Sequence, residues 1–144
     1  MKLASLEYLQ QVKERSNTDL EYLELAKGNN ESYTLVLEPE PAKGVTEQII
    51  IGFDNVDGKI NDIWIGQRPT QFTLSAPYGA WVDILRGKMG PTKAIASRKL
   101  RTQGPFLQLL QGSSRIIRWV EVLRTIPTEF EGTYAQYNLP GKPE

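Results

Sequence analysis

Three aspartates, Asp54, Asp57 and Asp62, lie close enough in the sequence to suggest a calcium or magnesium site. An EF-hand loop needs oxygen ligands at its third and fifth positions. Counted from Asp54, those positions hold Val56 and Gly58. We therefore interpret the cluster as a polar hairpin turn and predict no metal ligand here.

Catalytic side chains are also scarce, because the sequence contains neither cysteine nor histidine. The commonest general base and the thiolate nucleophile are thereby absent. Glu129 and Glu131 form a carboxylate pair, but it lies beside a proline-rich segment. The loop 87–90 lacks the Gly-Lys-Ser/Thr ending of a phosphate-binding loop. Ser113-Ser114 has no general base near it in sequence that could activate a serine nucleophile. We predict no enzymatic activity, no catalytic residue and no cofactor.

Charge is balanced overall but unevenly distributed. Residues 1–62 hold twelve acids and six bases, whereas residues 63–144 hold five acids and eleven bases. Residues 86–124 contain nine bases and one acid, Glu121. Such a concentration of positive charge attracts phosphates, anionic lipid head groups or nucleic acid. A solvated surface that keeps the domain soluble explains the charge distribution equally well.

Residues 1–65 predict two helices followed by three strands. Apolar residues at helical spacing indicate helices over residues 1–28. Strands are expected at 33–38, 47–53 and 59–65, where β-branched and aromatic residues gather. Asp57-Gly58 between the last two is typical of a hairpin turn.

Beyond residue 65 the pattern indicates a fourth strand at 71–76 and a helix that begins at Pro77. A fifth strand follows at 98–102, and an amphipathic helix at 116–123. Clustered strands favour an α+β fold, with one mostly antiparallel five-stranded sheet and helices on one face. We expect one domain over 1–144: N-terminal helices at 1–28, a core at 30–125 and an extended tail at 126–144.

The C-terminal half is rich in apolar side chains. Residues 106–110 and the helix at 116–123 are apolar on more than one side, and a single sheet face covers only one of them. The other side either packs into a larger hydrophobic core or faces a ligand cavity, a partner or a membrane.

Residues 72–104 show a strand, a helix that ends in Gly87-Lys88, then Pro91, a Lys93-Ala94 pair, a Lys99-Leu100 strand and Gly104 before the last helices. This pattern resembles the sterol carrier protein-2 family. The hairpin at 56–60 also fits, and the resemblance covers residues 30–125. It implies a sheet covered by helices around an apolar tunnel, and the binding and transfer of a lipid without reaction.

This resemblance implies two sets of site residues. The tunnel wall corresponds to apolar side chains of the C-terminal half: Trp81, Leu85, Phe106, Leu109, Leu110, Ile117 and Val120. Basic residues are expected to contact a lipid head group or an anionic membrane: Arg98, Lys99, Arg101, Arg115 and Arg118. The expected ligand is a fatty acid, an acyl-CoA, a sterol or an isoprenoid lipid.

The main alternative is an interaction module without a lipid. Val36, Ile50 and Trp64 are expected on the sheet face opposite Leu35 and Ile51, because side chains alternate along strands. An apolar second face would suit a homodimer. Nucleic acid is not expected as a partner, since no known binding motif is present. The N-terminus lacks the apolar segment of a secretory signal, and we expect a cytoplasmic location.

Overall fold

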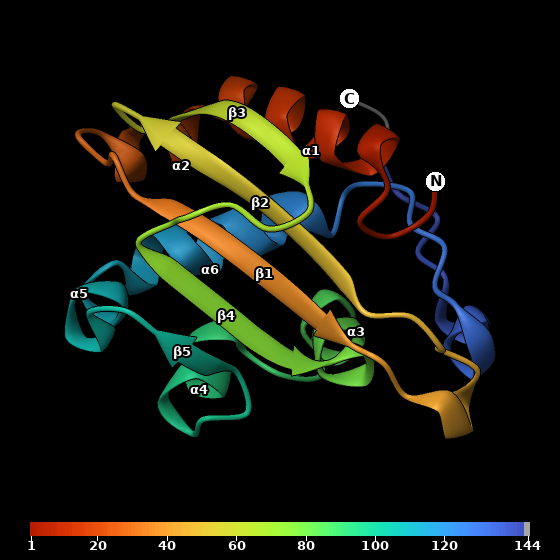
Figure 1. The fold of residues 1–144 in the computed structure, drawn as a ribbon. Coiled ribbons are helices and arrows are strands. Elements are labelled where there is room, and N and C mark those ends of the chain that lie inside the picture. Colours follow the sequence, from red (N-terminus) through yellow and green to blue (C-terminus); the bar gives the residue numbers. More distant parts are fainter. Residues whose placement is uncertain (143–144) are drawn as a thin grey trace.

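The computed structural model describes residues 1–142, in which a five-stranded sheet packs against helices on one face (Figure 1). The strands are β1 (Ser32–Glu38), β2 (Ile49–Val56), β3 (Lys59–Ile65), β4 (Phe72–Pro77) and β5 (Arg101–Gln103). The α-helices are α1 (Leu6–Thr18), α2 (Leu20–Ala26), α3 (Tyr78–Leu85), α4 (Pro91–Ala96), α5 (Phe106–Gln111) and α6 (Ser113–Leu123). Short 3-10 helices lie at Pro41–Lys43 and Gly132–Tyr137. The predicted α+β class and five-stranded sheet are confirmed.

The hairpin between β2 and β3 has the predicted two-residue turn. Asp57 has φ 49° and Gly58 has φ 84°. Positive φ at both central residues matches the twist of the flanking strands and favours Asp-Gly. A side chain at Gly58 would come within 2.5 Å of the Ala26 carbonyl oxygen at the end of α2. The turn therefore also fixes how closely α2 approaches the sheet.

The strands follow the order β3-β2-β1-β4-β5, and β1 pairs with β4 in parallel while the other neighbours are antiparallel. This arrangement requires the chain to cross the sheet between β3 and β4. In Figure 1 that connection passes over β2 and β1 on the face without helices. Thr70 in the connection lies 2.7 Å, hydroxyl to hydroxyl, from the buried Thr34 of β1.

The same connection packs on part of the second face of the sheet. Val36 and Trp64 lie outside the main core, as the alternation predicts, yet both are buried. The guanidinium of Arg68 stacks 4.5 Å from the centroid of the Trp64 ring. Two of the three apolar residues expected on the dimer face are therefore buried within the monomer, while Ile50 is half-buried.

The first two α-helices begin at residues whose side chains cap them, Ser5 for α1 and Asp19 for α2. The Ser5 hydroxyl accepts a hydrogen bond from the Tyr8 amide at 3.2 Å, and the Asp19 carboxylate accepts one from the Tyr22 amide at 2.9 Å. The last strand starts later than the expected 98–102, because Arg98 takes a left-handed conformation with φ 64° that ends α4. Only residues from Arg101 onward pair with β4.

Residues 126–142 do not form the extended tail that the sequence predicts. They fold back against the N-terminus, where Leu3 donates its amide to the Glu129 carbonyl at 3.0 Å. Thr128 and Leu139 exchange backbone hydrogen bonds, and Ile126 and Phe130 are buried in the main core. The prolines favour extended backbone locally, but the apolar residues between them pack against the main core.

Candidate functional site

A cavity of about 110 Å³ lies between the helix-covered face of the sheet and the helices. Its floor is formed by residues of β1, β2 and β4 that point toward the helices, among them Leu35, Ile51 and Leu74. Its roof comes from all six α-helices. Apart from Asn55, Arg115 and tyrosine hydroxyls, the described residues around it present apolar side chains.

Aromatic side chains hold one wall in place. Tyr33 stacks on Phe53 with ring centroids 5.0 Å apart, and Phe53 contacts Trp119 at 5.1 Å. These offset and tilted contacts favour a defined ring geometry over a fluid interior. Trp81 is fixed by its indole N–H, which donates to the carbonyls of Val36 and Ala76 at 3.1 and 3.2 Å.

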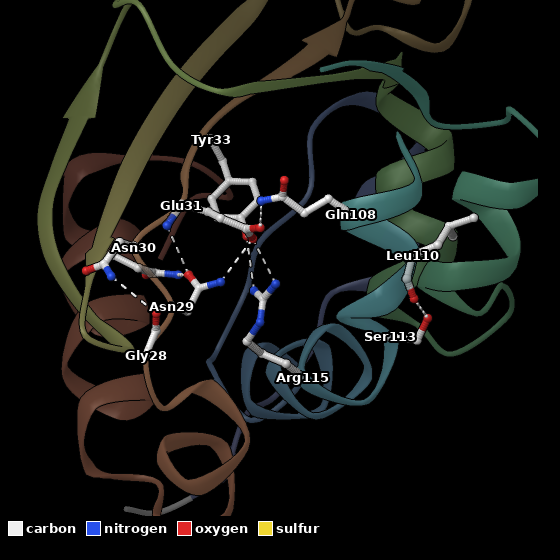
Figure 2. Close-up of polar contacts among 10 residues, drawn as sticks. Gly28, Asn29, Asn30, Glu31, Tyr33, Gln108, Leu110, Ser113 and Arg115 are labelled. Atoms are coloured by element: carbon white, nitrogen blue, oxygen red, sulfur yellow. Dashed lines mark hydrogen bonds and ion pairs between the residues drawn. The ribbon is translucent and has the colours of Figure 1, made fainter. Parts of the chain in front are cut away.

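One end of the cavity is polar and is built around a buried ion pair (Figure 2). Arg115 of α6 donates from Nη2 to Glu31 Oε1 at 2.9 Å, and from Nη1 to the Tyr33 hydroxyl at 3.0 Å. The Tyr33 hydroxyl in turn donates to Glu31. All three side chains are buried, although Glu31 directly precedes β1 and Arg115 lies near the start of the last α-helix.

Further donors surround the Glu31 carboxylate. Asn29 donates from Nδ2 to Oε1 at 3.0 Å, and Gln108 of α5 donates from Nε2 to Oε2 at 2.7 Å. Burial by itself would raise the pKa of Glu31, but these donors, Tyr33 and the Arg115 charge together lower it. Burial also raises the pKa of Tyr33, which stays protonated. Glu31 is thus an ionised group whose oxygens are already occupied, which suits a structural role better than proton transfer.

The structure separates the seven residues that were expected to form the tunnel wall. Trp81, Leu85, Leu109 and Val120 line the cavity. Phe106 and Leu110 are partly buried against the core, and Ile117 is 44% exposed. Their contact with a ligand, and the tunnel itself, remain predictions.

The five basic residues that were expected at a head group also fall into separate places. Arg115 is in the interior, and Arg118 pairs with Asp19 at 2.7 Å from Nη2 to Oδ1. Arg101 pairs with Glu38 across the sheet edge. Arg98 and Lys99 are exposed in the α4–β5 connection. Buried Arg115 cannot contact a membrane surface, because the fold directs it toward Glu31.

Several cavity residues were not anticipated from the sequence. Leu9 and Val12 of α1 line the cavity, as do Tyr22 of α2 and Asn55 of β2. Helical spacing marked Leu9 and Val12 as a buried face, but it did not show what that face covers. Asn55 lies beyond the strand predicted at 47–53, in a segment whose residues are typical of a turn, so no local signal marked it as a cavity residue.

The fold and cavity define a small α+β protein whose helices and sheet enclose an apolar interior. The model of the SCP-2 sterol transfer family matches residues 9–117. The chain therefore belongs to this family, as its sequence resemblance indicates.

Solved structures share the fold. A sterol carrier protein 2 aligns with TM-score 0.77 at 20% identity, covering 87% of this chain and 99% of its own. A Thermus thermophilus protein described as possibly a sterol carrier aligns with TM-score 0.74 at 20% identity, covering 86% and 89%. Sterol carrier protein-2 of Aedes aegypti, solved in complex with palmitate, aligns with TM-score 0.51 at 16% identity, covering 81% and 96%.

No curated protein sequence matches the chain. In the part of the chain that the structure describes, no helix is both long and apolar enough to cross a bilayer.

Proposed function

We propose that this protein binds an apolar lipid in the interior cavity and carries it without chemical change. The observation that supports this function best is the cavity wall, to which every α-helix and three strands contribute mostly apolar side chains. Burying an alkyl chain there gains about 0.8 kcal/mol per CH₂ group. Membership of the SCP-2 sterol transfer family supports the same function, as does palmitate in the Aedes aegypti structure.

Binding a long lipid requires the cavity to widen. Its volume of about 110 Å³ is well below the roughly 300–1,000 Å³ of typical small-molecule pockets. We propose that α5 is the wall that moves. This helix has six residues and no side-chain cap, and Leu109 is its one buried residue. Its displacement would break the Gln108–Glu31 hydrogen bond and open the cavity beside the last helix, while leaving the sheet intact.

The binding proposal is tested by filling the cavity from α6. In Val120→Phe the added ring should occupy the cavity and weaken fatty-acid binding by at least about tenfold. Ile117→Phe makes a comparable change on the same helix at an exposed position outside the cavity wall, and should bind like the unmodified protein. Affinity is measured by titration with a fluorescent fatty acid. Equal affinity in Val120→Phe would exclude the cavity as the binding site.

Lipid delivery is proposed to use a basic groove around α4. The groove has a volume of about 290 Å³ and is lined by Lys88, Lys93 and Lys99 beside Met89, and Arg98 is exposed next to it. These cations form no ion pair with other described residues, unlike Arg101, Arg115 and Arg118. Anionic head groups attract such a surface at about 1 kcal/mol per basic residue.

The membrane contact is tested with lipid transfer between vesicles. Lys93→Glu together with Lys99→Glu should slow transfer to vesicles that contain phosphatidylserine, and added salt should slow transfer by the unmodified protein. Lys59→Glu, exposed at the β2–β3 turn, is the matched control and should transfer normally. Unchanged transfer by the double variant would contradict the proposed contact.

A further inference from the structure

Asn55 places an unused hydrogen-bond acceptor at the polar end of the cavity. Its side chain is 2% exposed and borders the cavity together with Tyr22, Tyr33 and Arg115. Its Oδ1 atom is buried and has no hydrogen-bond partner among the described residues. A buried acceptor without a donor costs free energy, so this atom is a natural contact for a ligand.

The orientation of the Asn55 amide follows from its neighbours. A carboxylate only accepts hydrogen bonds, so Asn29 must direct Nδ2 toward Glu31 Oε1. This leaves Asn29 Oδ1 as the acceptor for Asn55 Nδ2 at 2.8 Å and for the Glu31 amide at 3.2 Å. The Asn55 donor is therefore already used, and its oxygen is the atom that remains unpartnered.

Charge around the cavity disfavours an anionic ligand group at this end. Arg115 is the only charged residue that lines the cavity within residues 1–142, and Glu31 already neutralises it. A second carboxylate would compete with Glu31 for Arg115 and would lose its own hydration. A neutral group that donates a hydrogen bond meets neither obstacle.

We propose that the cavity end at Asn55 is a subsite for the hydroxyl group, or another neutral donor, of the bound lipid, and that Asn55 Oδ1 accepts its hydrogen bond. The protein then prefers a neutral lipid alcohol over an ionised acid of equal chain length. This inference rests on the proposed lipid-binding function and specifies the ligand class for the same cavity.

The test compares three ligands of matched size on the full chain by isothermal titration calorimetry at neutral pH. They are decanol, decanoate and methyl nonyl ether, which is an isomer of decanol without a donor. We expect decanol to bind about tenfold more tightly than the ether and than decanoate, the effect of one buried hydrogen bond. This comparison uses the unmodified protein and does not depend on the folding of a variant.

Asn55→Leu then assigns the preference to one atom, since leucine has a similar size and no acceptor. The variant should bind decanol and the ether equally, whereas Asn30→Leu, an exposed change of the same kind outside the cavity wall, should keep the preference. If the unmodified protein binds decanol and the ether equally, or prefers decanoate, the subsite is wrong while lipid binding stands. If none of the three ligands binds, the carrier function itself is overturned.

Discussion

Glu31 and Arg115 stand 84 positions apart in the sequence, yet Oε1 of one lies 2.9 Å from Nη2 of the other in the interior of the protein. The contact joins the start of β1 to the start of α6 beside the cavity (Figure 2). It therefore links the sheet to the helix that carries much of the cavity roof.

Breaking this pair should be costly. Arg115→Met leaves Glu31 buried without its cation and should lower the free energy of unfolding by about 3–5 kcal/mol. Arg98→Met, an exposed change, should have little effect. Urea denaturation followed by circular dichroism measures both. The double variant Glu31→Leu with Arg115→Met should recover part of the loss, and a double variant less stable than Arg115→Met would argue against a coupled pair.

The low pKa of Glu31 predicts a specific dependence of stability on pH. A carboxylate whose pKa is lower in the folded state stabilises the protein above its ordinary value, 4.5, and loses this effect as pH falls through the folded value. The stability difference between the unmodified protein and Glu31→Gln should therefore narrow as the solution becomes acidic. Urea midpoints measured from neutral to acidic pH test this, with Glu7→Gln, a change at an exposed position of α1, as control. If the stability difference between the two proteins stayed constant over this pH range, Glu31 would not be the group responsible for the pH dependence.

The contact of Gly52 with Trp64 predicts a strict size limit at the centre of β2. A Cβ atom at Gly52 would come within 2.4 Å of the Trp64 ring, so Gly52→Ala should destabilise the protein by about 1–3 kcal/mol. At Gly90 the nearest atom to an added Cβ is 4.0 Å away and φ is −71°, so Gly90→Ala should be tolerated. Thermal unfolding compares the two variants. Equal melting temperatures would mean that Trp64 is not packed on the strand as described.

The C-terminal segment should behave as part of the core. Phe130 is 4% exposed, and Phe130→Ala should cost about 3–5 kcal/mol through the lost contacts and the cavity left behind. Gln136→Ala, in an exposed position of the same segment, is the control and should change stability by less than about 0.5 kcal/mol. Denaturant titration tests both. A small loss of stability in Phe130→Ala would instead support the extended tail that the sequence predicts.

Local patterns in the sequence were sufficient to predict most of the helices and strands. Helical spacing in the first 28 residues, the Asp57-Gly58 turn and the strand composition at 59–65 each act over a few neighbouring residues, and each predicts an element that the structure contains. The resemblance over residues 72–104 added the family, which the match to residues 9–117 confirms.

Only the tertiary structure decided how these elements meet. It paired β4 with β1 in parallel, folded Phe130 into the core and turned Arg115 inward to Glu31. It also brought Asn55 to the cavity and placed Ile117 outside its wall. These outcomes depend on contacts between residues far apart in the chain, and periodicity reports which side of an element is apolar, not what that side faces. The sequence by itself therefore determined the elements and the family, while packing across the sheet determined the cavity and its polar end.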